Sequence, residues 1–106
     1  MTDPTLEEFI EYITRNEQMA FTYNGILYSI EPSYEEDIGK SFLNVWLCDQ
    51  ILDGKRISPT RLVHLEIPSN EYVPKSSIEK VLNKKWIIGN KSFMEVVDEI
   101  VVTEIG

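Results

Sequence analysis

Cysteine and histidine each occur only once in this chain of 106 residues, as Cys48 and His64. A single cysteine excludes an internal disulfide, and one residue of each type excludes a zinc site built from several cysteines and histidines. A nucleophilic pair of Cys48 with His64 is possible in principle, but apolar neighbours and the adjacent Asp49 disfavour a thiolate. We therefore expect no metal ion, no cofactor and no enzymatic activity.

Long hydrophobic runs are also lacking. The apolar stretches are only a few residues long, whereas a membrane-spanning helix needs about 20 apolar residues. Residues 1–4 are polar and acidic, unlike the basic and apolar start of a secretory signal peptide. With one unpaired thiol in addition, the sequence predicts a cytoplasmic protein that does not enter a membrane.

Basic residues are scarce in the first half of the chain. The sequence has 10 lysine and arginine residues against 18 aspartate and glutamate residues, which gives a net charge of −8. Residues 1–54 hold 11 acidic and 2 basic side chains, whereas residues 55–91 hold 8 basic and 3 acidic side chains. Such an uneven distribution indicates a charged partner.

A strong hairpin signal is present at residues 19–30. Asn24-Gly25 separates two alternating apolar segments, and both residues tolerate the positive φ angles of a type I′ turn. A two-residue loop also sets the register of the strands. The predicted cross-strand pairs are Tyr23 with Ile26, Phe21 with Tyr28, and Met19 with Ile30. These side chains share one face, which we expect to cover the core.

Three segments have the pattern Ser/Thr-x-x-Glu, which is typical of a capping box at the start of a helix. They begin at Thr5, Ser76 and Ser92. The first helix is expected to end near Asn16 and to pack its apolar stripe on the hairpin, because apolar residues recur there at helical spacing. The stripe consists of Leu6, Phe9, Ile10 and Ile13. The other two segments predict short helices near the C-terminus.

The segment after the hairpin has a different character. Residues 31–40 are acidic, are interrupted by Pro32 and Gly39, and contain little apolar material, so we expect a surface loop. Residues 41–48 are rich in strand-forming residues that are apolar on both faces. They favour a buried strand over a helix.

The rest of the chain completes the fold class. Asp53-Gly54 predicts a second hairpin, and residues 60–67 alternate like a strand, although Ser58-Pro59 also suits the cap of a short helix. The side chains expected to share one face of that strand are Arg61, Val63, Leu65 and Ile67. Residues 100–105 are mostly β-branched and predict a terminal strand. Residues 1–106 together predict one α+β domain with a mainly antiparallel sheet, an N-terminal helix and two short C-terminal helices.

Both ends of the chain resemble known proteins. The matching segments are Thr5-Leu6-Glu7-Glu8-Phe9-Ile10, Phe21-x-Tyr23-Asn24-Gly25-x-x-Tyr28-Ser29-Ile30 and Ile88-Gly89-x-Lys91-Ser92-Phe93-x-Glu95-Val96-x-Asp98-Glu99-Ile100. They are similar to small uncharacterised proteins of low-GC Gram-positive bacteria and their prophages. The motifs are caps, a turn and core positions, so the resemblance implies no catalytic residues. It implies a small accessory protein, often encoded by a mobile element, and residues 31–75 lie outside it.

Acidic side chains of the first half are the candidate contacts for a partner. We expect a non-catalytic protein-binding module that inhibits or regulates a basic or nucleic-acid-binding protein. Some small acidic phage proteins act in this way, as DNA mimics that inhibit nucleases, including CRISPR effectors. The candidate residues are Glu7, Glu8, Glu11, Glu31, Glu35, Glu36 and Asp37. We expect the first helix and the following loop to present them as one negative surface.

Two other functions stay open. The lysines of residues 75–91, with Trp86 among them, resemble a phosphate-binding stripe with a stacking aromatic residue, which indicates direct nucleic-acid binding. The net negative charge of the chain opposes such binding. A small accessory protein with a housekeeping role is the third alternative.

Overall fold

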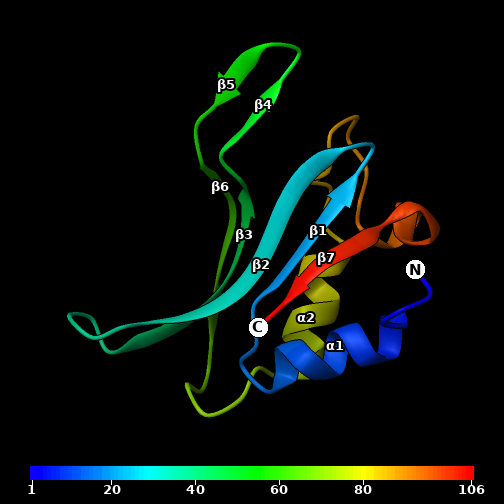
Figure 1. Ribbon diagram of the computed structural model, residues 1–106. Helices are drawn as coiled ribbons and strands as arrows, with labels where there is room; N and C mark the ends of the chain where they lie inside the picture. Colours follow the sequence, from blue (N-terminus) through cyan, green and yellow to red (C-terminus); the bar gives the residue numbers. More distant parts are fainter.

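A five-stranded antiparallel sheet forms the centre of the protein, with the strand order β6–β3–β2–β1–β7 (Figure 1). The computed structural model describes residues 1–106. Its elements are α1 (Leu6–Thr14), β1 (Met19–Tyr23), β2 (Ile26–Glu35), β3 (Lys40–Leu47), β4 (Gln50–Leu52), β5 (Lys55–Ile57), β6 (Thr60–Ile67), α2 (Lys75–Leu82), the 3₁₀ helix η1 (Met94–Glu99) and β7 (Val101–Ile105). The predicted α+β class, with an N-terminal helix and two short C-terminal helices, is confirmed.

The β1–β2 hairpin forms in the predicted register. Asn24 and Gly25 make its two-residue turn with φ angles of 50° and 77°, both in the left-handed region. The pairs are Met19 with Ile30, Phe21 with Tyr28, and Tyr23 with Ile26. All of these side chains are buried except Ile26, which is half-buried. The predicted core face of the hairpin is therefore confirmed.

β2 continues well beyond the hairpin and pairs with β3 as far as Glu35. The surface loop predicted for residues 31–40 is therefore wrong, because only residues 36–39 form a turn. Leu27 directs its N–H and C=O to the β3 side, so alternation directs the missing N–H of Pro32 to the β1 side. Because β1 pairs with β2 only as far as Ile30, Pro32 deprives no neighbouring strand of a hydrogen bond.

β3 confirms the buried strand predicted for residues 41–48, and β6 pairs with its other side. The β3–β6 register shifts between Val45 and Trp46, so that Trp46 pairs with Arg61. The Arg61 guanidinium lies 5.7 Å from the centroid of the Trp46 ring. The prediction that Arg61 shares a face with Val63 is therefore wrong, since one extra residue in a strand reverses the side chains beyond it.

The other predicted strands are also present. β6 confirms the strand at residues 60–67 over a helix capped by Ser58-Pro59. The β4–β5 hairpin turns at Asp53 and Gly54, whose φ angles are 51° and 76°. β7 confirms the terminal strand and lies at the edge of the sheet, beside β1.

α1 begins at the predicted capping box. The backbone N–H of Glu8 donates to Thr5 Oγ1 at 3.2 Å, and the Thr5 N–H donates to Glu8 Oε1 at 3.0 Å. Phe9 and Ile13 are buried, and the helix ends close to the predicted end at Asn16. No helix of the chain is both long enough and apolar enough to cross a membrane.

Of the two C-terminal helices, only the second begins at its predicted capping box. Pro74 is the N-cap of α2, and its C=O accepts the first helical hydrogen bonds. Ser76 lies within the first turn, so the capping box predicted there is wrong. The box of Ser92 and Glu95 does form, with reciprocal hydrogen bonds of 3.2 and 3.1 Å, but it opens a 3₁₀ helix that is kinked at Val96.

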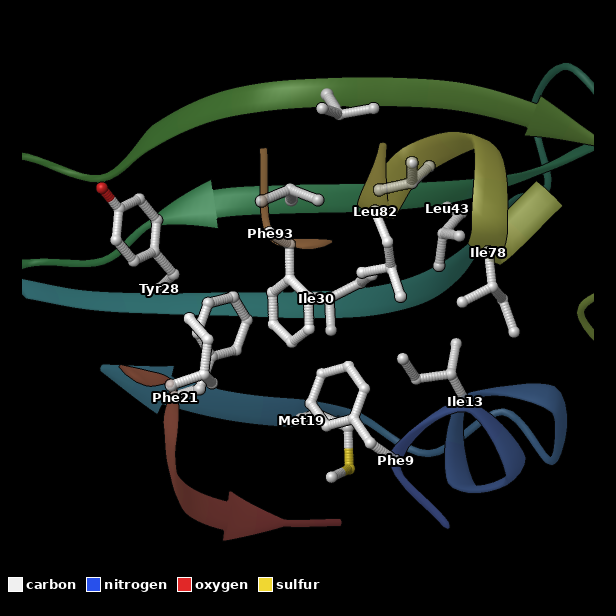
Figure 2. Packing of buried hydrophobic residues seen from close by; sticks show 14 of the residues in the cluster. Phe9, Ile13, Met19, Phe21, Tyr28, Ile30, Leu43, Ile78, Leu82 and Phe93 are labelled. Carbon is white, nitrogen blue, oxygen red and sulfur yellow. The ribbon is translucent and has the colours of Figure 1, made fainter. Parts of the chain in front are cut away.

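The core contains a cluster of 19 buried residues between the sheet and the helices (Figure 2). Its centre is aromatic. The Phe21 ring centroid lies 6.0 Å from that of Phe9, 5.7 Å from that of Tyr28 and 5.1 Å from that of Phe93. These rings come from α1, β1, β2 and the segment before η1, so aromatic contacts join the two ends of the chain.

The side of the sheet away from this core carries a second set of side chains. We call it the open face, and alternation along β2, β3 and β6 defines its members. They are Ser29, Glu31, Ser33, Glu35, Lys40, Phe42, Asn44, Trp46, Arg61, His64 and Glu66. Both helices lie on the other side, where their apolar residues join the core.

Candidate functional site

The seven predicted contact residues fall into two groups. Three lie on α1, which packs on the core side of the sheet, and four lie on β2 and the turn after it. The first group is Glu7, Glu8 and Glu11, and the second group is Glu31, Glu35, Glu36 and Asp37. Figure 1 shows α1 and the far end of the β2–β3 hairpin well apart, so the two groups form separate acidic surfaces.

On α1, Glu8 has a structural task. Its carboxylate accepts hydrogen bonds from the backbone N–H and the hydroxyl of Thr5, and these bonds hold the pKa of Glu8 below its ordinary value. Glu7 and Glu11 are exposed and form no ion pair. Their carboxylates are therefore free to meet a partner.

A groove of about 670 Å³ runs between α1 and α2. It is lined by Leu6, Glu7, Ile10, Glu11, Thr14, Lys75, Glu79, Leu82 and Met94. Sequence periodicity assigns Leu6 and Ile10 to the core and does not reveal this groove. The sequence signal for the groove is the width of the apolar stripe on α1. The stripe has more apolar residues than the core covers, because only Phe9 and Ile13 are fully buried.

Residues 34–40, which are the turn between β2 and β3 and the strand residues beside it, form a tip. Glu36 and Asp37 are exposed there and form no ion pair, while Lys40 is already paired at 3.2 Å with a carboxylate of β6. Two large apolar side chains at the tip are also exposed, Tyr34 at 48% and Ile38 at 52%. The tip therefore combines unpaired negative charge with exposed apolar area.

A polar network joins three strands on the open face. Asn44 Nδ2 donates to Ser33 Oγ at 2.8 Å, and Asn44 Oδ1 lies 2.6 Å from Nδ1 of His64. The His64 ring stacks on Phe42 with centroids 3.8 Å apart, and its Nε2 lies 3.8 Å from Glu35 Oε1. The imidazole contacts no hydroxyl or thiol, so this network holds no activated nucleophile.

Cys48 lies just after β3 and is half-buried, although the sequence placed it inside the strand. His64 pairs with Asn44, which is separated from Cys48 by roughly 13 Å of strand. Cys48 and His64 therefore do not form a nucleophilic pair. No group of three histidine, cysteine, aspartate or glutamate side chains is arranged to hold a metal ion.

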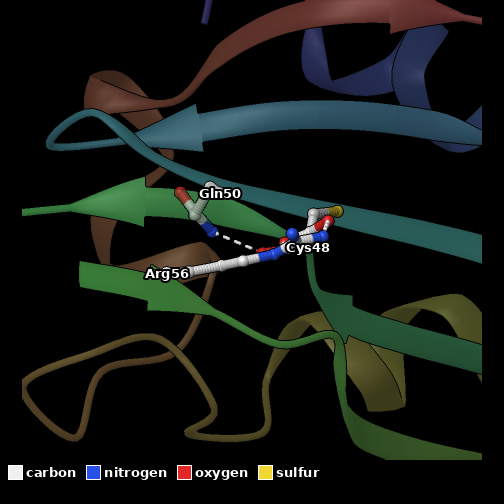
Figure 3. A network of polar contacts seen from close by, with 4 residues as sticks. Cys48, Gln50 and Arg56 are labelled. Atoms are coloured by element: carbon white, nitrogen blue, oxygen red, sulfur yellow. Dashed lines mark hydrogen bonds and ion pairs between the residues drawn. The ribbon is translucent and has the colours of Figure 1, made fainter. Parts of the chain in front are cut away.

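The β4–β5 hairpin, which we call the arm, is fixed at its base by polar contacts (Figure 3). Gln50 Oε1 accepts from the N–H of Leu27 at 2.7 Å, and Gln50 Nε2 donates to the C=O groups of Leu27 and Cys48 at 2.9 Å. Arg56 donates to Asp49 at 2.8 Å, and this contact raises the pKa of Arg56. The side chain of Gln50 thus bonds to β2 as a neighbouring strand would.

The lysines of residues 75–91 have diverse environments. Lys85 forms an ion pair of 3.5 Å with a glutamate of η1, and Lys91 Nζ lies 5.9 Å from the centroid of the Tyr23 ring. Trp86 packs against the core, and its Nε1 donates to the C=O of Val81 at 2.8 Å. Its indole ring is therefore part of the wall of the core, which is a poor position for stacking on a base.

Comparison with other proteins assigns neither a family nor a function to the chain. No protein-family model, no curated protein and no solved structure matches the chain. The function is therefore inferred from sequence patterns and from the placement of the side chains.

Proposed function

We propose that the protein is a non-catalytic protein-binding module that contacts a basic partner through the tip of the β2–β3 hairpin. The observation that carries this proposal is the combination of unpaired Glu36 and Asp37 with exposed Tyr34 and Ile38. Carboxylates speed the encounter with a basic surface, and aromatic and apolar side chains then supply buried area.

The position of the tip supports this function. Residues 31–35 of β2 lie beyond the last residue that pairs with β1, so this part of the hairpin extends past the β1–β2 pair. Figure 1 shows the tip projecting from the body of the molecule. A projecting hairpin can enter a concave site on a partner without rearrangement of the core.

The charge of the hairpin supports a particular class of partner. Four carboxylates follow one another along β2 and the tip, from Glu31 to Asp37. Such a row is attracted to the lysines and arginines that otherwise hold phosphate groups. We infer a cytoplasmic inhibitor or regulator of a basic or nucleic-acid-binding protein. We infer that it is of the phage or mobile-element type, on the basis of the sequence motifs at both ends of the chain.

Charge reversal at the tip tests the proposal. The variant that combines Glu36→Lys with Asp37→Lys changes two exposed side chains and leaves the core intact. Wild-type protein is expected to retain a basic protein from a host lysate at low salt and to release it at high salt. The variant is expected to associate with that protein more slowly and with a shallower salt dependence.

A second charge reversal controls for net charge. Glu99→Lys combined with Glu104→Lys makes the same charge change at exposed positions away from the tip and should largely preserve binding. Unchanged binding of the tip variant at low and moderate salt would show that the tip is not the contact. If wild-type protein instead shifts plain nucleic acid in a gel and retains no basic protein, the lysines of residues 75–91 are the functional surface.

A further inference from the structure

The groove between α1 and α2 keeps apolar side chains in contact with solvent. Leu82 is buried in its floor, while Leu6, Ile10 and Met94 are half-buried. Burial of such side chains in a complex is favourable, because apolar area is removed from water. The groove therefore has an apolar surface that no other part of the chain covers.

The shape of the groove matches a helix. Its lining residues on α1 are positions 6, 7, 10, 11 and 14, and those on α2 are positions 75, 79 and 82, so each helix contributes one stripe at helical spacing. A third helix packs into such a seat with its ridges in the grooves of the other two. α1 has 9 residues. At about 1.5 Å per residue its length suits two to three turns of a bound helix.

The rim of the groove is negatively charged. Glu7 and Glu11 line it on α1 and Glu79 lines it on α2, against the single base Lys75. All four side chains are exposed and none forms an ion pair. An occupant with positive charge beside its apolar face is therefore favoured over a neutral or acidic one.

We propose that this groove binds a basic amphipathic helix of a partner protein. The apolar face of that helix lies on Leu6, Ile10 and Met94, and its lysine or arginine side chains lie beside Glu7 and Glu11. The proposal rests on the proposed function, namely binding of a basic partner. It adds a second contact surface and names the kind of segment that the surface takes.

A second copy of this chain does not supply such a helix. The most apolar positions of α1 and α2 are already buried in the core of their own molecule, and they are Phe9, Ile13, Ile78, Val81 and Leu82. The outer side of α2 is polar, with exposed Ser76 and Lys80, and it lacks an apolar face. The occupant therefore belongs to a different protein.

The proposal is tested with a synthetic peptide, so the physiological partner is not needed. The probe is a helical peptide of about fourteen residues, with leucine at every third or fourth position and lysine elsewhere. It is titrated into ¹⁵N-labelled protein while amide chemical shifts are recorded. We expect the shift changes to cluster on α1, on α2 and around Met94. A peptide of the same composition with its leucines scattered over all faces is expected to bind much more weakly.

Two sets of variants separate the groove from general attraction by charge. Glu7→Gln combined with Glu11→Gln is expected to weaken peptide binding about fivefold. Asp53→Asn combined with Glu104→Gln removes the same charge at distant exposed positions and is expected to leave binding unchanged. Ile10→Ala removes apolar contact and keeps a good helix former, so it should also weaken binding. Thermal unfolding verifies that each variant is folded.

Three outcomes would overturn the proposal. The first is an absence of shift changes at high peptide concentration. The second is a scatter of shift changes over all acidic surfaces, with equal losses in both double variants. The third is binding that neither the Glu7 and Glu11 variant nor Ile10→Ala weakens. Because the assay does not involve the tip or its partner, failure at the groove is distinguishable from failure of the proposed function.

Discussion

Residues with positive φ mark the turns of this protein. Besides glycine, the residues that adopt such angles are Asn16, Asn24, Asp53 and Asn90. All are asparagine or aspartate, whose short polar side chains tolerate the left-handed region better than other side chains do. Two of them precede a glycine at the turn of a hairpin, so the chemistry of a dipeptide sets each of these turns.

The Asn24-Gly25 turn leads to the first prediction. Gly25 has a φ of 77°, and a Cβ added there would meet no atom within 4 Å. Gly25→Val is therefore expected to lower the free energy of unfolding by about 1–2 kcal/mol through backbone strain alone. Urea unfolding measures the loss, and Gly25→Asn should lose much less. An unchanged urea midpoint for the valine variant would show that backbone strain at this position is not significant.

The capping carboxylates lead to a prediction about acid. Hydrogen bonds from Thr5 lower the pKa of Glu8, and the backbone N–H of Ser92 is the main cause that lowers the pKa of Glu95. In the unfolded chain both pKa values lie near 4.5, above the folded values. Their stabilisation is therefore complete above the unfolded pKa and is lost as the pH falls through the folded pKa.

Urea unfolding over a series of acidic pH values measures this effect. Glu8→Gln combined with Glu95→Gln is expected to flatten the fall in the free energy of unfolding below the unfolded pKa, since neither side chain then titrates. Glu7→Gln removes a carboxylate that is not part of a cap and should keep the wild-type slope. Equal slopes for wild type and the double variant would contradict the stabilising role of these caps.

Residue-level features were predictable where they depend on near neighbours alone. The Thr5 cap and the Asn24-Gly25 turn are of this kind. Ser76 matches the pattern of a capping box equally well, but α2 begins earlier, after Pro74, so Ser76 lies within the first turn and caps no helix. The orientation of Arg61 depends on a bulge in the pairing of β6 with β3, which no local pattern of β6 reveals.

At the scale of elements, the second half of β2 was the main feature that sequence patterns missed. Its acidic residues and Pro32 are typical of a loop. The segment is nevertheless a strand, because β3 pairs with it along its whole length while β1 is absent on its other side. A free edge tolerates both proline and charge, and only the three-dimensional pairing shows where that edge begins.

The arm provides a prediction at this scale. Gln50→Ala removes three hydrogen bonds and leaves the N–H of Leu27 without its partner. We expect the free energy of unfolding to fall by about 1–3 kcal/mol, and amide hydrogen exchange in β4 and β5 to accelerate. Ile51 lies in the same strand and is 73% exposed, so Ile51→Ala should change stability by less than about 0.5 kcal/mol. Equal effects of the two variants would show that Gln50 does not anchor the arm.

At the scale of the whole molecule, the layers decide which acidic residues act together. α1 lies on the core side of the sheet, whereas Glu31 and Glu35 lie on the open face. Sequence patterns located each acidic group but not the face that each occupies, because that depends on the packing of α1 and the course of β2. Sequence patterns also could not predict the groove, because α1 and α2 are far apart in the sequence and meet only in the folded chain.

The net charge of −8 provides a prediction about the folded molecule as a whole. Self-repulsion opposes the compact state, so exposed carboxylates without ion pairs are expected to reduce stability. At the tip, Glu36→Gln with Asp37→Asn brings the net charge from −8 to −6, and Glu36→Lys with Asp37→Lys brings it to −4. Lys55→Glu, at an exposed position on the arm, brings it to −10.

At low ionic strength, the free energy of unfolding is expected to rise in the order −10, −8, −6 and −4 for this charge series. In about 1 M salt the Debye length falls to about 3 Å, so the differences should largely disappear. Urea unfolding at the two salt concentrations measures both effects. An order that persists unchanged in high salt would show that local contacts, and not net charge, set the differences. A gain in stability at low salt alone would show that the charges of Glu36 and Asp37 lower the stability of the folded chain through long-range repulsion.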